Sequence, residues 1–236
     1  MESFTYDEQF RRELATHAHH FGEVRLLERA AAAGMTAVDV GANRGVTTVA
    51  MAGRVGPTGR VYAFEPVPEY YRVLRATLSR NGADNVTALP MALGDRGGHI
   101  TYYKCGEGSG IVSQDDAEEI RVDVTGFDAF ADANGVGHVD LINMDCEGSE
   151  LLALRGAERT LRTGPVTLLC EVHRGRLDAL GQSPRQIVTW LEERGFAVQP
   201  VLTEDLQKQV DYDNCTHLFA TRDVASADAG AQKRPT

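Results

Sequence analysis

Acidic side chains and one histidine gather after two apolar, strand-like runs in the second half of the chain. Asp145, Glu147 and Glu150 follow the run DLINM, and Glu171 and His173 lie at the end of the run VTLLCEV. Carboxylates this close together raise the pKa of at least one member or require cationic partners, and such clusters point to functional sites. A carboxylate or an imidazole can take a proton from a nucleophile, so these residues predict a site of general acid-base chemistry.

A tight turn between a strand and a helix, with the sequence AVDVGANRGV at 37–46, predicts a ligand loop in the first half of the chain. Gly41 and Gly45 allow the backbone to bend sharply and to approach a ligand closely. Asp39 lies inside the apolar strand, where a carboxylate is costly unless it is partnered. The turn therefore predicts one wall of a binding site, although an ordinary strand-to-helix turn remains an alternative.

The spacing of this turn argues against nicotinamide binding. The dinucleotide fingerprint G-x-G-x-x-G, started at Gly41, requires glycine where this chain has Asn43 and Val46. An acid at the carboxyl end of the next strand, Glu65 followed by Pro66, still fits a residue that accepts hydrogen bonds from ribose hydroxyls.

Composition bounds the class of protein. The 236 residues are 42% hydrophobic and 25% charged, with a formal net charge of −10, which fits one soluble α/β domain and disfavours a nucleic-acid partner. Four scattered cysteines without a C-x-x-C pair and an acidic start of the chain predict a cytoplasmic protein with reduced thiols. No uncharged apolar run reaches the roughly 18 residues of a membrane span, so a membrane partner is not expected.

Alternating strand and helix patterns, followed by a final hairpin, predict the fold. We expect a doubly wound, Rossmann-like, mostly parallel seven-stranded sheet with an antiparallel C-terminal edge strand. Its third strand is expected over 86–93, where Ala92 would lie beside an adenine. Residues 99–124 predict a β-hairpin insertion whose loop, rich in Gly, Ser and acid, could cover a substrate or be a solvated excursion. The domain should span 35–222, with a disordered tail over 223–236.

Residues 1–34 predict a helical cap. One helix is expected from a capping box at Thr5 to about Ala33. His17, His19 and His20 within it form a cluster, but their spacing does not place all three on one face of a helix. A partly exposed helix covering the site is therefore favoured over a metal site.

Four motifs occur in order along the chain: D-x-G-A-N-x-G, E-P, D-x-E-G-x-E and E-x-H. Together they resemble the FkbM family of class I S-adenosylmethionine-dependent methyltransferases. The residues that carry the resemblance are Asp39, Gly41, Ala42, Asn43, Gly45, Glu65, Pro66, Asp145, Glu147, Gly148, Glu150, Glu171 and His173. Two positions depart from the family: Asn143 stands where a lysine is common, and Arg44 where an apolar residue is usual.

The resemblance implies S-adenosylmethionine as cofactor and a class I methyltransferase domain over 35–222. The residues expected around the cofactor are Asp39, Gly41, Ala42, Asn43, Gly45, Glu65, Pro66, Ala92 and Asp145. It also implies O-methylation of a hydroxyl on a small natural product or sugar, with an enzyme of this size compatible with a homodimer. Asp145, Glu171 or His173 is expected to accept or relay the proton, and Glu147 to orient the site.

Other functions remain open on the sequence. N-methylation is one, and metal-assisted O-methylation is another, in which Asp145, Glu171 and His173 would be the ligands, although no metal is predicted. A nicotinamide-dependent oxidoreductase or a non-catalytic cofactor-binding protein is also compatible with the fold.

Overall fold

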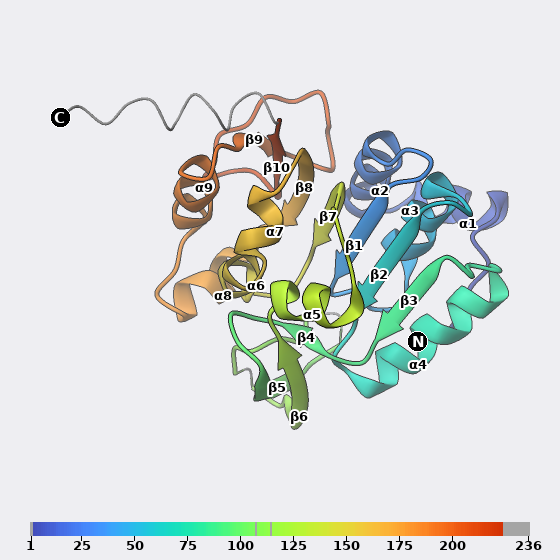
Figure 1. Ribbon diagram of the computed structural model, residues 1–236, viewed down its shortest axis with the longest axis horizontal. Coiled ribbons are helices and arrows are strands. Elements are labelled where there is room, and N and C mark those ends of the chain that lie inside the picture. The colour runs from blue at the N-terminus through green and yellow to red at the C-terminus, as the bar shows by residue number, and fades with distance from the viewer. Residues whose placement is uncertain (1, 107, 114, 224–236) are drawn as a thin grey trace.

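A single large sheet organises the chain in the computed structural model, which describes residues 2–106, 108–113 and 115–223. Within these residues the sheet has seven strands in the order β3-β2-β1-β7-β8-β10-β9 (Figure 1). Their bounds are β1 Thr36–Val40, β2 Arg60–Phe64, β3 Val86–Leu89, β7 Leu141–Met144, β8 Val166–Glu171, β9 Ala197–Val201 and β10 His217–Arg222. The tail predicted over 223–236 lies, from 224 onward, outside the described residues.

The strand directions confirm the predicted doubly wound fold. Strands β3, β2, β1, β7 and β8 pair in parallel, and β10 pairs antiparallel with both β8 and β9. The antiparallel strand is therefore inserted one position from the edge, and β9 forms the edge. Consecutive strands run outward from β1 in both directions, so the crevice for a ligand lies at the carboxyl ends of β1 and β7.

Helices cover both faces of the sheet, as Figure 1 shows. Helices α2, α3 and α4 pack on one face, and α5, α6, α7 and α9 on the other. The helices are α1 Glu8–Leu14, α2 Ala18–Ala30, α3 Val46–Val55, α4 Pro68–Arg80, α5 Phe127–Asn134, α6 Glu150–Gly156, α7 Glu158–Arg162, α8 Arg174–Ala179 and α9 Pro184–Glu192.

Strand β1 lies between these two helical layers. Ala37 packs on the α2 and α3 side, and Val38 and Val40 pack on the opposite side. Successive side chains of a strand point to opposite faces, so a strand covered on both faces needs apolar residues at every position. Asp39 breaks that rule, which makes it a residue whose partners must be identified.

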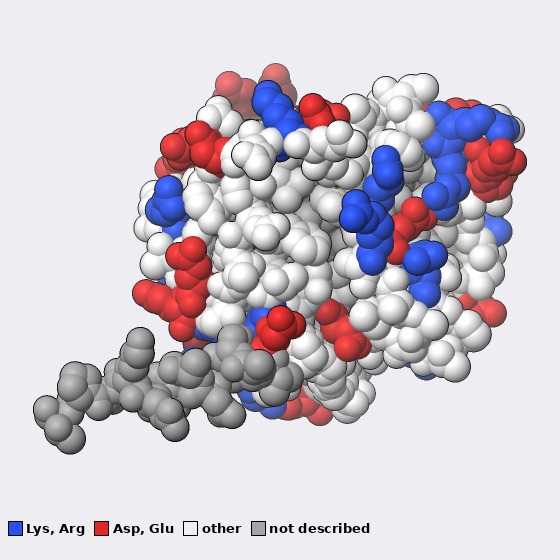
Figure 2. All heavy atoms as spheres, turned by 90° about the horizontal axis from the view of Figure 1, so that it is seen from above, with Lys and Arg blue, Asp and Glu red and all other residues white. Residues whose placement is uncertain are grey.

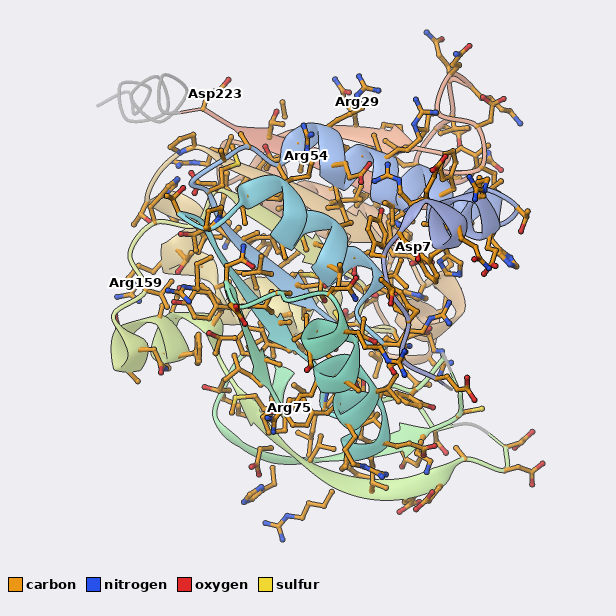
Figure 3. All side chains as sticks on the ribbon, turned by 90° about the vertical axis from the view of Figure 1, so that its right-hand side faces the viewer. Asp7, Arg29, Arg54, Arg75, Arg159 and Asp223 are labelled. Carbon is orange, nitrogen blue, oxygen red and sulfur yellow. The ribbon has the colours of Figure 1, made fainter. Side chains whose placement is uncertain are left out.

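The N-terminal helix predicted as one element is two helices, so that prediction is wrong in its continuity. Asp7, labelled in Figure 3, begins α1 by accepting a hydrogen bond from the backbone N–H of Phe10 at 2.9 Å, the capping role that had been expected of Thr5. The Thr16 hydroxyl donates to the Glu13 carbonyl at 2.7 Å. Such a local bond competes with continued helix, and the chain turns before α2 begins.

The third strand is also divided. Residues 86–89 form β3 of the large sheet, whereas β4, Ala92–Leu93, belongs to a three-stranded sheet in the order β4-β6-β5. Pro90 lies between them, and proline has no N–H to continue a ladder. The other strands of the small sheet, β5 Gly98–Lys104 and β6 Glu118–Thr125, are antiparallel and confirm the predicted hairpin.

Two arginine side chains connect neighbouring helices within each helical layer. Figure 3 shows Arg159 on the α5 side of the fold, where its guanidinium contacts Asp132 at 2.6 Å and donates to the Asp128 carbonyl at 2.9 Å. On the opposite side, Arg54 of α3 donates to the Glu28 carbonyl of α2 at 2.9 Å. These bonds hold helices of each layer to one another.

Charge on the face drawn in Figure 2 is mixed. Lys and Arg gather toward one side of that view with Asp and Glu beside them, and the middle of the face carries few charges. Over the part of the chain that the structure describes, every helix is too short or too polar to cross a bilayer.

Candidate active site

A cavity of about 480 Å³ lies at the carboxyl ends of β1, β7 and β8. The loop at 41–47 forms one wall, and Phe10 and Leu14 of α1 form another. Glu23 of α2 faces the same space. The N-terminal helices therefore contribute directly to the cavity, as expected of a cap.

A second, smaller compartment adjoins the cavity beneath the insertion. Glu65 and Tyr102 line this compartment, and Gly41, Asp145 and Glu147 line both spaces. The two compartments therefore meet at the end of β7. The second compartment measures only about 20 Å³, so the 480 Å³ cavity provides the room for the body of a ligand.

The turn after β1 has the backbone that its glycines predict. Gly41 has φ +85°, and a Cβ there would lie 1.7 Å from the Asp145 carbonyl oxygen. Gly45 has φ +93°, and Asn43, with φ +47°, adopts the left-handed conformation that asparagine tolerates better than most residues. The turn at 41–45 and the residue after β7 are therefore in close contact, and position 41 has no space for a side chain.

Asp39 is fully buried behind this loop rather than exposed to the cavity. Its carboxylate accepts hydrogen bonds from the hydroxyls of Thr47 and Thr48 and, at 3.0 Å, from the side-chain amide of Asn143. Burial raises the pKa of Asp39, and these three bonds oppose the rise. The contacts tie β1 to the first turn of α3, so Asp39 acts on the loop from behind.

Glu65 holds the same loop from the end of β2. Its carboxylate accepts from the backbone N–H groups of Asn43 and Val67, each at 2.8 Å. Pro66 has no N–H, so the side chain reaches past it to Val67. Burial raises the pKa of Glu65 to about 7, against the lowering effect of the two backbone bonds.

His173 lies at the centre of the carboxylates that the sequence singled out. Its Nδ1 is 2.8 Å from Glu150, and its Nε2 is 3.4 Å from Asp145, 3.5 Å from Glu147 and 3.6 Å from Glu171. Burial works to lower the pKa of His173, but the hydrogen bond to Glu150 and the surrounding negative charges outweigh it and raise the pKa to about 10. The imidazole is therefore a cation at neutral pH, and both of its ring nitrogens face carboxylates.

Glu147 is fixed from the insertion side. It has φ +51°, uncommon for a residue with a side chain, and Gly148 follows with φ +100°. Arg176 of α8 contacts the Glu147 carboxylate at 3.4 Å and donates to the Gly108 carbonyl at 2.6 Å. One guanidinium thus connects the insertion to the acidic cluster, a contact that the sequence did not indicate.

Glu171 has histidine partners from both ends of the chain. Its carboxylate is 3.2 Å from Nε2 of His19 on α2 and 3.8 Å from Nε2 of His217 on β10. Burial disfavours ionisation of Glu171, but the hydrogen bond from His19 and the nearby imidazoles prevail and lower its pKa to about 2. The sequence had not assigned a role to either histidine.

The sequence of residues 39–198 matches the methyltransferase FkbM domain, more than half of the chain. The chain belongs to the FkbM methyltransferase family. None of the curated proteins matches it significantly. Family and fold together support methyl transfer that depends on S-adenosylmethionine.

Solved structures share the fold of this FkbM methyltransferase at low sequence identity. A putative rRNA methylase from Clostridium thermocellum has a TM-score of 0.54 at 12% identity, covering 84% of this chain and 91% of that one. Methyltransferase FkbM from Methylobacillus flagellatus KT has a TM-score of 0.51 at 19% identity, covering 87% of this chain and 52% of that one. Cofactor-bound Rv0187 from MTB has a TM-score of 0.51 at 16% identity, covering 93% and 81%.

The structure shows the surroundings of the two residues that depart from the family pattern. Asn143 donates to Asp39 inside the core, and Arg44 lines the cavity with its guanidinium 5.6 Å from the ring centre of Phe4. Ala92, expected beside an adenine, is buried in the small sheet, paired with Val124, and lines neither compartment. Its part in cofactor binding stays a prediction.

Proposed function

We propose that this FkbM methyltransferase transfers a methyl group to a hydroxyl oxygen of a small molecule, such as a sugar or another natural product. The single observation that carries the proposal is the position of the Asp145 carboxylate. It lies at the junction of the two compartments, beside the Gly41 turn, with 36% of its side chain exposed to them.

The loop at 41–45 and Glu65 are suited to hold S-adenosylmethionine. The Asn43 side-chain oxygen is buried without a hydrogen-bond partner among the described residues, an acceptor that an ammonium group of the cofactor could satisfy. Gly41 leaves room for close approach, and the Glu65 carboxylate has lone pairs left for ribose hydroxyls. We assign Asp39 a positioning role, because its carboxylate holds the first turn of α3 behind the loop and does not line the cavity.

Bound S-adenosylmethionine supplies an electrophilic methyl group on a sulfonium. The residues of the chain then have two tasks, which are to align the acceptor oxygen behind that methyl and to take its proton. We assign the proton to Asp145, because its carboxylate is the more exposed of the two that line both compartments, and because burial and the charge of Glu171 raise its pKa, which makes the ionised carboxylate a stronger base. Glu147 is held by Arg176, and both nitrogens of His173 face carboxylates, so these two residues orient and balance charge.

The charge of the cavity favours a neutral or cationic acceptor. Carboxylates from α1, α2, the loop after β7, and β8 line it: Glu13, Glu23, Asp145, Glu147 and Glu171. A polyanion such as a nucleic acid would meet repulsion here, because like charges in a partly desolvated site cost several kcal/mol. This supports the expected small-molecule partner.

Calorimetry and mass spectrometry test the proposal. S-adenosylhomocysteine should bind and NAD should not; binding of NAD alone would overturn the assignment. Hydroxylated candidate acceptors should gain one methyl group, and gain on nitrogen instead would place the chain among N-methyltransferases.

The base is tested separately with Asp145→Asn. This variant should lower turnover by about 10² to 10⁴, the usual contribution of a general base, with S-adenosylhomocysteine affinity changed little. Asp123→Asn, in the distant hairpin, is the control. Wild-type turnover in Asp145→Asn would refute the role of Asp145.

A further inference from the structure

Two histidines from outside the matched FkbM domain meet the Glu171 carboxylate. His19 lies on α2, before residue 39, and His217 begins β10, after residue 198. His217 is directly opposite Glu171 in the antiparallel β8–β10 register. One ligand atom from each of the three residues lies within 4.8 Å of the others.

The Nε2 atom of His217 has no hydrogen-bond partner among the described residues, although the side chain is fully buried. The Glu171 carboxylate lies 3.8 Å from this atom, too far for a hydrogen bond. A buried polar atom without a hydrogen-bond partner is destabilising, so it calls for an explanation. An ion between the imidazole and the carboxylate would supply the missing partner.

Threonine hydroxyls fix the orientation of both rings. Nδ1 of His19 is 2.9 Å from the Thr203 hydroxyl, and Nδ1 of His217 is 3.2 Å from the Thr216 hydroxyl. The two hydroxyls are 3.1 Å apart, and Thr216 also contacts the Val201 carbonyl at 3.3 Å. Without an ion, Nε2 of His19 donates to Glu171. In the tautomer in which each Nδ1 carries the proton, which the threonine oxygens can accept, each Nε2 directs a lone pair toward Glu171, as an ion between them requires. Outer-shell bonds of this kind are what orient histidines that bind metals.

We propose that His19, Glu171 and His217 bind one divalent transition-metal ion of the zinc class. Two imidazoles and one carboxylate are a donor set suited to such ions and poorly suited to Mg²⁺, which prefers oxygen ligands. Three protein ligands leave at least one coordination position open. Glu171 also lines the main cavity, so the ion would lie at its edge.

A neighbouring set, Asp145, Glu171 and His173, has similar spacing and shares one residue with this site. We favour the two-histidine site because the buried Nε2 of His217 has no hydrogen-bond partner among the described residues, whereas both ring nitrogens of His173 face carboxylates. An ion at the favoured site could hold the acceptor oxygen, a role that rests on the proposed O-methylation. Binding of the ion does not rest on it.

Cobalt binding to tag-free, chelator-stripped protein tests the site. Co²⁺ gives an absorption spectrum that reports nitrogen and oxygen ligation, and Zn²⁺ competition gives the affinity of the colourless ion. The exposed thiol of Cys105 is removed first by Cys105→Ser. This protein should bind one equivalent of Co²⁺, and Zn²⁺ should displace it.

Variants locate the ion. His19→Ala should weaken Co²⁺ binding more than tenfold, and Thr203→Val should weaken it by about 10–100-fold, the usual effect of losing an outer-shell partner. His217→Asn should do the same as His19→Ala; if it does not fold, His19→Ala carries the test, since the His19 side chain is 26% exposed. His99→Ala, whose imidazole pairs with Asp123 at 2.6 Å in the hairpin, is the matched control and should bind normally.

Three results would overturn the proposal. One is the absence of stoichiometric binding, and another is equal affinity in the parent protein and His19→Ala. The third is a loss of binding in Asp145→Asn with none in His19→Ala, which would place the ion in the neighbouring set. No methyl transfer is measured, so failure here is distinct from failure of the proposed O-methylation.

Discussion

Replacement of Glu65 by glutamine should remove a pH dependence from the stability of the protein. Glu65 is 4% exposed, and burial raises its pKa from 4.5 to about 7. A carboxyl whose pKa is higher in the folded state binds a proton more tightly there than in the unfolded chain. Its contribution to stability is therefore complete below pH 4.5 and is lost as the pH rises through about 7.

The size of the effect follows from the shift. Each unit of pKa corresponds to about 1.4 kcal/mol, so ionisation of Glu65 should lower the free energy of unfolding by about 3 kcal/mol between pH 4.5 and pH 8. Glu65→Gln keeps the shape and one acceptor oxygen but cannot ionise. It loses one backbone hydrogen bond at every pH, a constant offset of about 1 kcal/mol.

Urea unfolding at intervals from pH 4 to pH 8 measures the effect in both proteins. The difference in unfolding free energy between wild type and Glu65→Gln should fall by about 3 kcal/mol across this range, because terms from other carboxylates largely cancel. Glu69→Gln is the matched control on the adjacent helix. The pKa of the exposed Glu69 is lowered by Lys104, so its removal should not reproduce this fall. A difference that stays constant with pH for Glu65→Gln would refute the reasoning.

Substitutions at three further sites test the loop and the insertion. Gly41→Ala should abolish S-adenosylhomocysteine binding in calorimetry and destabilise the protein by about 3 kcal/mol, because φ is positive and the new Cβ would lie 1.7 Å from the Asp145 carbonyl oxygen. Gly53→Ala, in helix α3 with open space around its Cβ, is the control and should stabilise the protein by about 0.5–1 kcal/mol. Asp39→Ala should lower the free energy of unfolding in urea by about 3 kcal/mol, because it leaves the buried donors of Thr48 and Asn143 and the half-buried donor of Thr47 without their acceptor. Asp39→Asn should lower it by about 1 kcal/mol, and equal losses would contradict the positioning role. Arg176→Ala should speed amide hydrogen exchange at 108–113 with little change in global stability, and unchanged exchange there would show that the guanidinium does not hold the insertion.

Local patterns were sufficient to predict the parts of the fold that depend on neighbouring residues. The glycines of the turn at 41–45 require a particular backbone, and apolar runs identify buried strands. Pro68 at the start of α4 and the capping box of Ser183 and Gln186 at the start of α9 are local signals of the same kind. The divided third strand could have been anticipated from Pro90, but its apolar neighbours masked the break.

Contacts between distant segments could not be predicted in this way. Asn143 reaches Asp39 across 104 positions, and Thr203 reaches His19 across 184. His19 was set aside because its helix alone does not group the three nearby histidines. The pairing of His217 with Glu171 depends on the register of β10, and a shift of one residue would point the imidazole to the other face of the sheet.

The N-terminal helices line the cavity although they lie outside the segment that matches the family. Phe10, Leu14 and Glu23 contribute to the cavity, yet all three precede the segment at 39–198 that defines the family match. The 41–45 loop, which we propose holds the cofactor, lies inside that segment. On this proposal, exchanging residues 1–34 between relatives would change the acceptor side of the cavity and leave the cofactor side intact.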